Sequence, residues 1–445
     1  MKRIALITFF GILLISFNIQ TVWAGKIDIV INKLVEKKIL SESEAKEIIN
    51  EIQKEADIEK AEIKKVAAKD TDINWYWKNG LNFETNDKAF KFKFGGRIMN
   101  DWAFMSEDDS VEALLGSLQN DTTEFRRARL YVSGTTYDRI IFKAQYDFAG
   151  GDADFKDVFI GLKKLPVVDW LKVGHFKEPF SLEELISCNY TTFMERSLPN
   201  AFAPGRNTGI GVHSATLNDR LTWAAGAFLD TNGYGDEGGT DHSYAVTARV
   251  TGLPWYGGKD KLLHLGLAYS YRDAVDDTVS FSERPEAHMA PRFVDTGNIA
   301  AGWENRLGLE AAYVHGPFCL QGEYIGTAVD ATGEPDRGFS GYYAYASYFL
   351  TGEHRPYSQK NGIFCRVKPN VNFGKGGIGA WEMGVRFSHL DLDDGAITGG
   401  DLDDITLGLN WYLNPNVRTM LNYIRADLDT VGDADILEMR FQIDW

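Results

Sequence analysis

The chain has 445 residues, a formal net charge of −16 and 13% aromatic residues. The acidic balance argues against nucleic acid as a partner, because nucleic-acid-binding proteins present basic surfaces. Cys188, Cys319 and Cys365 form no CxxC pair, so they are too few for a disulfide framework and wrongly spaced for a zinc site. Cys319 and Cys365 could pair in an oxidising compartment, although free thiols are the simpler interpretation.

The first 24 residues have the pattern of a secretory signal peptide. Lys2 and Arg3 precede the apolar run IALITFFGILLISF, and TVWAG supplies small residues before a cut after Ala24. Cleavage removes Lys2 and Arg3, so the mature charge becomes −18. No later stretch approaches the ~18 consecutive apolar residues that a membrane helix needs. An exported membrane protein with this sequence is therefore not helical.

Residues 25–70 are predicted to be helical. After Gly25 the segment contains no glycine, proline or aromatic residue, and apolar residues recur at helical spacing. Ser41 followed by Glu44 predicts a capping box at the start of a helix. Charges of both signs surround one apolar seam, which is typical of a solvated helix. We expect a periplasmic segment, either a coiled coil of three chains or a single helix lying against the base of the following domain.

From residue 71 onward the pattern changes to period-2 alternation. In LLHLGLAYSYRD (residues 262–273) and DITLGLNWYL (residues 404–413), apolar residues share one face and polar or small residues the other. Aromatic residues gather near the ends of such runs, and short and long connections alternate, as in outer-membrane barrels. A soluble β-sandwich also alternates, but export and a polar second face favour a transmembrane barrel with a wet lumen.

The size of the barrel follows from its length. About 370 residues at roughly 23 per strand and connection give about 16 strands, with 14 or 18 within error. The last strand, ILEMRFQIDW (residues 436–445), has a wholly apolar face that ends in Trp445. We expect this strand to close the barrel against the first strand, because closure removes the edges that lipid would leave unpaired. Residues 71–445 are thus predicted to form an all-β outer-membrane barrel.

Residues 124–212 carry a resemblance to a known family. The stretches EFRRARLYVSG, KAQYDFAGGDADFKDVFIG, LKVGHFKEPFSLEEL and TTFMERSLPNAFAPGRNTGIGV, with ERPEAHMAPRFVDTG further on, are similar to those of the phosphate-selective porins. The resemblance runs from about residue 84 to 445. It implies a 16-stranded trimeric barrel in the Gram-negative outer membrane, with basic residues along a constricted anion pathway. It also implies that the loop after residue 177 folds into the lumen.

The resemblance and the strand pattern together indicate pore residues. Arg127 and Arg129 share one strand face, which we expect to face the lumen because lipid excludes guanidinium groups; pairing with acidic neighbours such as Glu124 and Asp147 is the alternative. Arg126 falls on the lipid side of that alternation and is expected at the interface or in a loop. The predicted pore-lining and anion-binding residues are Arg127, Arg129, Asp157, Lys177, Arg196, Arg206, Arg284 and Arg292.

Some residues depart from the pattern of phosphate-selective members. Glu183, Glu184 and Asn189 stand where the family's inward loop carries lysines, and Glu283 and Glu286 interrupt a later basic stretch. The resemblance therefore supports the fold of the family more strongly than it supports selectivity for phosphate. The permeating solute could be phosphate, pyrophosphate, sulfate or a mixture of small hydrophilic solutes.

The sequence favours a passive channel for small anions. It contains no nucleophile elbow, HExxH or Walker loop, so we expect no enzyme activity, no metal and no cofactor. A general small-solute porin and a barrel that only tethers the envelope are the alternatives. Expected partners are membrane lipid, lipopolysaccharide, small anions and two further copies of the chain. The acidic stretch 391–404 is interpreted as an exposed outer loop, with Ca²⁺ or lipopolysaccharide bridging as a weaker possibility.

Overall fold

The computed structural model describes residues 33–37, 40–71, 73–118, 121–236 and 243–445, so the predicted signal peptide lies outside the described residues. The chain has two structural units, Met1–Ile73 with Thr85–Asp87 and Asn74–Glu84 with Lys88–Trp445. No helix among the described residues is both long enough and apolar enough to span a membrane.

The first unit contains a long helix, α3 (Glu42–Thr71). Its N-terminus has the capping box that the sequence predicts. The Ser41 backbone N–H donates to Glu44 Oε2 at 2.9 Å, and the Glu44 N–H donates to Ser41 Oγ at 3.3 Å. These two bonds satisfy amide groups that a helix start otherwise leaves without partners.

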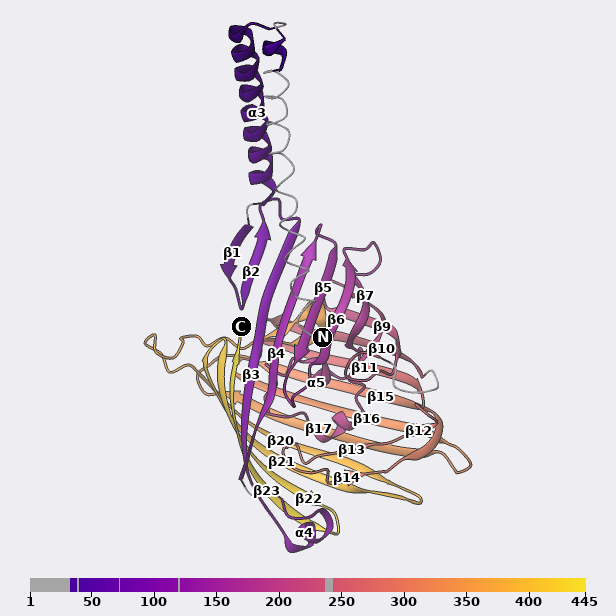
Figure 1. Cartoon of the computed structure of the whole chain (residues 1–445). Helices are drawn as coiled ribbons and strands as arrows, with labels where there is room; N and C mark the ends of the chain where they lie inside the picture. The colour runs from indigo at the N-terminus through magenta and orange to yellow at the C-terminus, as the bar shows by residue number, and fades with distance from the viewer. Residues whose placement is uncertain (1–32, 38–39, 72, 119–120, 237–242) are drawn as a thin grey trace. The chain divides into compact units, whose positions relative to one another are not determined.

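The second unit is a closed antiparallel barrel (Figure 1). Sixteen strands pair in chain order, and β23 returns to pair with β3 from Ala434↔Glu107 to Asp444↔Arg97. The predictions of about 16 strands and of closure by the last strand are confirmed. The sixteen are β3 (Phe90–Glu107), β4 (Asp121–Thr136), β5 (Ile140–Asp147), β6 (Asp154–Lys163), β7 (Trp170–Lys177), β8 (Arg206–Thr216), β9 (Leu221–Leu229), β10 (Tyr244–Gly258), β11 (Lys261–Asp273), β15 (Ile299–His315), β16 (Phe318–Ala331), β17 (Arg337–Phe349), β20 (Ala380–Asp394), β21 (Ile397–Asn414), β22 (Val417–Leu428) and β23 (Gly432–Asp444).

Alternation along each strand separates an apolar outside from a polar inside. In β11, Leu265 and Tyr269 are exposed while His264 and Ser270 are fully buried. The same holds to the end of β23, where Phe441 is 48% exposed. Exposed apolar side chains would be costly in water but suit contact with membrane lipid. The barrel therefore presents its hydrophobic face to the membrane and its polar face to the lumen.

Two short strands precede the barrel. β1 (Ile73–Trp77) pairs with β2 (Leu81–Thr85), and β2 pairs with the first part of β3 through Leu81↔Phe94. β23 occupies the rest of the same edge of β3, and Trp445 exchanges two backbone hydrogen bonds with Gly96 (3.0 and 3.1 Å). The edge of β3 is therefore shared end to end by two strands.

The acidic stretch 391–404 was predicted to be an exposed outer loop, and this prediction is wrong. Residues 391–394 and 397–404 belong to β20 and β21, so only Gly395 and Ala396 connect these strands. Leu392 and Leu402 in this stretch, and Leu390 just before it, are fully buried, so the strand pattern continues through an aspartate-rich sequence. The aspartates therefore decorate a hairpin and do not form a long outer loop.

On the other face of this hairpin, one group of possible metal ligands occurs among the described residues. His389 Nδ1 lies 2.8 Å from Asp403 Oδ1 and 3.3 Å from Asp401 Oδ1. Asp403 shares its strand phase with the exposed Ile405, so the group sits on the outer face of the barrel.

Most connections between the barrel strands are short turns or hold little structure. The connection after β3, for example, holds one short helix, α4 (Asp109–Leu115). Three long ones carry their own elements. Residues 178–205, here called the inward loop, hold α5 (Leu182–Leu185) and η2 (Leu198–Phe202). Residues 274–298 hold β12 (Thr278–Val279), β13 (Ser282–Glu283) and β14 (Val294–Asp295). Residues 350–379 hold β18 (Tyr357–Ser358), η3 (Gln359–Asn361) and β19 (Ile363–Phe364).

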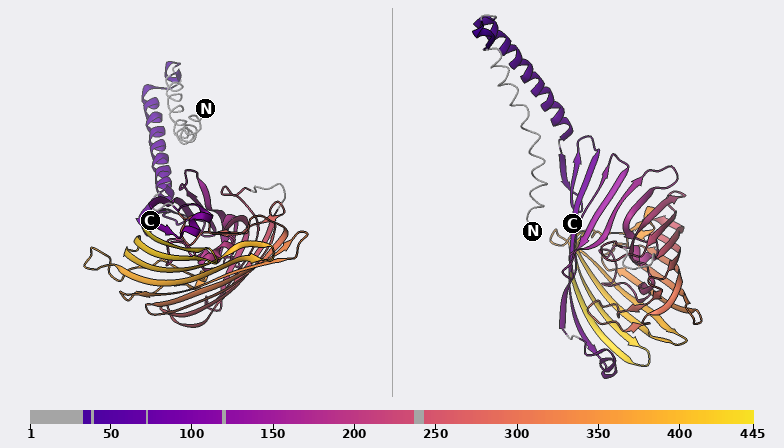
Figure 2. Two further views of the ribbon diagram at one scale, coloured as in Figure 1. Left: turned by 90° about the horizontal axis from the view of Figure 1, so that it is seen from below. Right: turned by 45° about the vertical axis from the view of Figure 1, so that its right-hand side comes forward.

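The second and third of these segments each pack on the inward loop and on the barrel wall. Phe202 of the inward loop lies 5.1 Å, ring to ring, from Phe281 of the second segment. Phe364 of the third segment shares an apolar cluster with Leu182 and Phe193 of the inward loop. Figure 2 shows the strands of the barrel and the irregular segments between them from two further directions. The lumen is thus filled in part by loops that carry their own apolar contacts.

Candidate functional site: a basic cavity in the barrel lumen

The inward loop crosses the lumen, because its residues touch opposite walls. On β3, Arg97 Nη1 donates to Cys188 Sγ at 2.7 Å. On β16, which lies on the far side of the barrel from β3 in the strand order, Glu323 Oε2 accepts a hydrogen bond from the Leu182 N–H at 2.9 Å. Several parts of the sequence far apart along the chain therefore converge at the loop.

A cavity of about 150 Å³ lies between the inward loop and the wall formed by β3 to β8. Seven basic side chains line this cavity, but only one carboxylate, Asp157, does. We call it the basic cavity. Its lining residues are Arg97, Arg127, Arg129, Lys143, Gln145, Asp157, Lys177, Leu185, Ser187, Cys188, Arg196 and Arg206.

Two carboxylates are each shared by two of these cations. Asp157 on β6 lies 2.5 Å from Lys143 Nζ and 2.8 Å from Arg206 Nε. Glu184 on α5 lies 3.0 Å from Lys177 Nζ and 3.1 Å from Arg196 Nε. Each carboxylate carries one negative charge, so it neutralises the charge of only one of its two basic partners.

Two further arginines of the cavity pair with carboxylates outside its lining. Arg129 Nε lies 2.6 Å from Asp147, and Arg127 Nη1 lies 3.4 Å from Glu195. Within the described part of the chain, Arg97 has no carboxylate within 4.0 Å. Seven cations and the four carboxylates that pair with them leave an excess of three positive charges, and ionisation of Cys188 would lower this excess to two.

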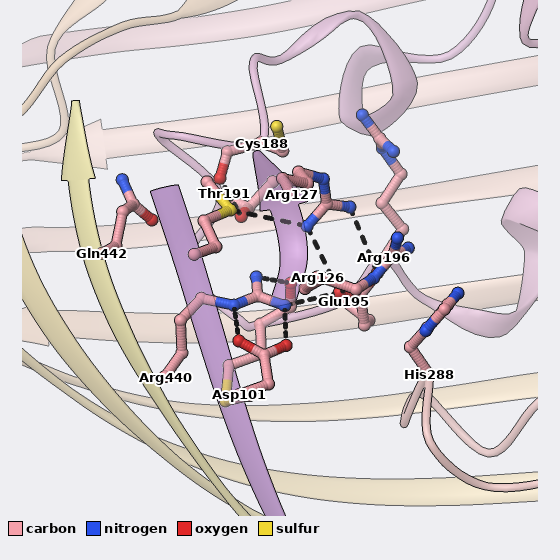
Figure 3. A network of polar contacts seen from close by, with 12 residues as sticks. Asp101, Arg126, Arg127, Cys188, Thr191, Glu195, Arg196, His288, Arg440 and Gln442 are labelled. Carbon is pink, nitrogen blue, oxygen red and sulfur yellow. Dashed lines mark hydrogen bonds and ion pairs between the residues drawn. The ribbon is translucent and has the colours of Figure 1, made fainter. Parts of the chain in front are cut away.

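Glu195 holds the inward loop against several arginines (Figure 3). Arg126 contacts it through two nitrogens at 3.0 Å each, and Arg440 Nη2 lies 2.6 Å away. Arg440 also pairs with Asp101 of β3, at 2.5 Å. The expectation that Arg126 lies at the interface or in a loop is therefore wrong, because it stands in β4 and turns toward the inward loop. The pairing of β3 with β4 shifts between Met99 and Asn100, and this irregularity lets neighbouring arginines both turn inward.

The cavity contains a buried donor that no protein acceptor satisfies. Gln145 is 1% exposed, lines the cavity, and its Nε2 has no hydrogen-bond partner among the described residues. A buried amide donor left without a partner costs free energy. A hydrogen-bond acceptor in the cavity, such as an oxyanion or water, would remove that cost.

The charges shift the pKa values of groups on the inward loop. Burial raises the pKa of Glu184, but Arg196 and Lys177 outweigh burial and bring it to about 2. The pKa of Glu195 falls well below its ordinary value, because Arg126, Arg127 and Arg440 overcome the cost of burial. The pKa of the Cys188 thiol is also well below its ordinary value, since Arg97 and Arg127 overcome burial there. The field at the loop thus favours negative charge at each position.

The structure brings six of the eight predicted pore residues together. Arg127, Arg129, Asp157, Lys177, Arg196 and Arg206 line the basic cavity. Arg284 lines a neighbouring cavity with Glu283 and Glu286, and it donates to the His288 carbonyl at 2.9 Å. Arg292 is exposed and lies in neither cavity.

Sequence reasoning missed Arg97 and Lys143. Lys143 stands two residues before Gln145 and four before Asp147 on β5, so period-2 alternation could have indicated a lumen position. Arg97 follows two glycines in β3, which interrupt the alternation that would have assigned its face.

A closed sixteen-stranded barrel with an apolar exterior and a loop that crosses a polar lumen defines an outer-membrane channel protein. A sequence model of the family described as "Phosphate-selective porin O and P" matches residues 92–445. Porin O of Pseudomonas aeruginosa is 29% identical over 401 residues, which cover 80% of this chain and 89% of that protein. The chain belongs to the phosphate-selective porin O and P family. It is an outer-membrane porin that forms a channel for anions.

Solved structures share the fold at low sequence identity. OmpT with a deletion of loop L8, an outer-membrane protein of Vibrio cholerae, is 14% identical with a TM-score of 0.52, over 80% of this chain and all of that one. An anion-selective porin from Comamonas acidovorans is 12% identical with a TM-score of 0.50, over 80% of this chain and all of that one. At these identities the similarity concerns the barrel alone.

Proposed function

We propose that the basic cavity is the selectivity filter of the channel and that small oxyanions pass through it by diffusion. The observation that carries this proposal is the excess of positive charge in the lining, seven basic side chains against one carboxylate. The description of the family supports an anionic solute.

The lining has the chemistry that oxyanions require. A guanidinium presents a planar fork of N–H donors that can bind two oxygens of phosphate, sulfate or carboxylate at once. The free donor of Gln145 adds a neutral hydrogen bond. A channel must also release its ion, and the four partner carboxylates limit how strongly the cations can hold it. Passage requires no covalent step and no cofactor.

The same carboxylates favour a broader filter than that of a phosphate specialist. Glu184 and Asp157 each neutralise part of the cationic cluster at 3.1 Å or less. We therefore propose a mild anion preference that admits phosphate, pyrophosphate or sulfate alike. A general porin for small hydrophilic solutes is the second candidate, and the pairing of the cations is what favours it.

We further propose that the chain works as a homotrimer, with the signal peptide removed and the helical segment in the periplasm. The exposed apolar face of the barrel supplies surface for lipid and lipopolysaccharide as well as for other subunits. Native and heated samples of the detergent-solubilised protein would be compared by sedimentation, and a monomer alone in the native sample would contradict the trimer.

Planar-bilayer recording tests the proposed filter. With the purified channel in a salt gradient, we expect a reversal potential on the anion side. A unit charge about 7 Å from an ion in a water-like medium is worth roughly 0.6 kcal/mol, with opposite sign for an anion and a cation. Arg127→Ala or Arg196→Ala should therefore each lower the anion-to-cation permeability ratio about sevenfold. Unchanged ratios in both variants would leave these arginines as wall residues and would refute the proposal.

A further inference from the structure

A second cavity adjoins the basic cavity inside the lumen. It has a volume of about 220 Å³ and shares Asp157, Lys177 and Leu185 with the basic cavity. Its other walls come mainly from the lumen faces of β6 to β9 and from residues 361 and 363 of the long segment between β17 and β20. We call it the aromatic cavity, for the side chains described next.

Three rings and one ammonium group form its core. Lys172 Nζ lies 4.0 Å from the ring centre of Trp170, 4.6 Å from that of Phe159 and 5.8 Å from that of Phe176. Phe159 stands two residues after Asp157 on β6, so both project from the same face of one strand. An anion held by Lys143 or Arg206, the two cations that pair with Asp157, and a group among these rings would therefore be neighbours along the wall.

Small residues keep this space open. A Cβ at Gly211 would come within 3.1 Å of the Phe176 ring, and Ala224 projects the smallest possible side chain into the same cavity. Hydrogen bonds hold the segment that contains residues 361 and 363 against the barrel wall. His213 Nε2 lies 2.7 Å from the Lys360 carbonyl, and Arg249 donates to the Gly362 carbonyl at 3.0 Å. The cavity is therefore a built feature of four strands and one lumen segment.

The two cavities differ in what they can bind. The basic cavity offers charge and hydrogen bonds, which an inorganic oxyanion can use in full. The aromatic cavity offers ring faces, which an inorganic oxyanion cannot use. An apolar cavity of about 150 Å³ is large enough to hold benzene, so about 220 Å³ accommodates one ring. Binding sites of this kind typically join an apolar wall to a few placed polar groups.

We infer that the channel selects oxyanions that carry one aromatic ring, such as aryl phosphates or aryl carboxylates, with the anionic group in the basic cavity and the ring in the aromatic cavity. This inference rests on the proposed anion filter and narrows its solute class. Lys172 contributes positive charge beside the ring, which favours an anionic aryl solute over a cationic one.

The test compares phenyl phosphate with inorganic phosphate as blockers of chloride current through the full-length channel in planar bilayers. Removing about 60 Å² of ring surface from water corresponds to roughly a tenfold change in affinity. We therefore expect phenyl phosphate to half-block the current at a concentration about tenfold lower than inorganic phosphate does. Benzoate against acetate should show the same order.

A variant locates the effect. Ala224→Leu fills the aromatic cavity without changing a charge, and we expect it to abolish the advantage of phenyl phosphate while the anion-to-cation permeability ratio stays the same. Ala227→Leu on the exposed face of the same strand is the matched control and should keep the advantage. An advantage that survives Ala224→Leu would overturn the assignment of the ring to this cavity.

The outcomes separate the inference from the proposal on which it rests. Equal block by phenyl phosphate and inorganic phosphate, in a channel that remains anion-selective, would refute the aryl preference and leave the filter standing. A channel without anion preference would refute the filter itself. The comparison of the two blockers uses the unmodified protein, so it stands even where Ala224→Leu does not fold.

Discussion

Glu183 and Glu184 are neighbours in the inward loop, but they face opposite walls of the lumen. Glu184 pairs with Lys177 and Arg196 beside the basic cavity. Glu183 accepts hydrogen bonds from the Ser197 N–H and Oγ, at 3.0 and 2.6 Å, and lies 3.3 Å from Arg386 of β20. Two residues with the same chemistry thus do different work, one in the field of the filter and one in anchoring the loop.

The wider surroundings follow the same division. On the side of β16, Glu323 accepts from the Leu182 N–H at 2.9 Å and from the Glu183 N–H at 2.7 Å. On the side of β3 to β8, cations outnumber the carboxylates that pair with them. The charged groups on the side of β16 and β20 therefore bind the inward loop. The wall of β3 to β8 has an excess of positive charge that can act on the solute.

The largest expected effect is a charge reversal in the filter. Arg97→Glu changes the local charge by two units at a residue that lines the cavity without a carboxylate partner among the described residues. At roughly 0.6 kcal/mol per unit charge, with opposite sign for the anion and the cation, the anion-to-cation permeability ratio should fall about fiftyfold. Arg292→Glu makes the same change at an exposed loop residue and should have little effect, because salt screens it beyond ~10 Å. Equal effects in reversal-potential measurements would contradict the assignment of the filter.

A smaller effect separates the two glutamates. Glu184→Gln removes one negative charge beside the cavity, so the anion-to-cation permeability ratio should rise about sevenfold. Glu183→Gln is the matched control, and we expect its ratio to stay near that of the unmodified channel because the side chain faces Arg386 and Ser197. Reversal potentials of both variants in the same gradient would decide, and a rise in Glu183→Gln alone would invert the comparison.

The charge of Glu184 should depend on pH only in strong acid. Since the folded pKa of Glu184 is about 2, this carboxylate stays ionised, and its effect on selectivity stays constant, from pH 7 down to about pH 3. Its contribution to stability is present above its ordinary pKa of 4.5 and is lost as the pH falls toward 2. In acid-unfolding experiments Glu184→Gln should lack this part of the pH dependence. An identical pH dependence in both proteins would mean that the pKa of Glu184 is not lowered on folding.

The smallest change in selectivity is expected on the anchoring side. Glu323→Ala leaves two backbone donors of the inward loop without acceptors, which should lower the free energy of unfolding by about 1–3 kcal/mol while the permeability ratio stays constant. Glu334→Ala, at a side chain that is 68% exposed, should change neither. Thermal unfolding in detergent measures the first quantity. A shifted permeability ratio in Glu323→Ala would show that the anchoring wall also acts on the ion.

Period-2 alternation was enough to predict the barrel. The apolar phase of residues 262–273 and of the last strand turns outward as expected, and the last strand closes on β3. The same rule failed at Arg126, where an irregularity in strand pairing changes the phase and nothing local in the sequence marks it. The alternation also continues through residues 391–404, but aspartates and glycines there obscure the buried leucines in the sequence.

The contents of the lumen were the harder part. The inward loop was expected only through the family resemblance, and its contacts join residues up to 253 positions apart, such as Asn189 and Gln442. The entry of residues 350–379 into the lumen rests on packing such as that of Phe364 against Leu182, which no periodicity indicates. Alternation assigns a side chain to the lumen, but tertiary contacts decide which wall or loop it meets there.

Anomalous diffraction from crystals soaked in bromide tests the central claim most directly, because it locates anions without reference to conductance. We expect bromide within hydrogen-bond distance of Arg97, Arg127 or Arg129 in the basic cavity, and we expect it to be lost from this cavity in Arg97→Glu. Bromide confined to exposed loops, with none in the basic cavity, would contradict the claim that the excess charge between the inward loop and β3 to β8 selects the ion.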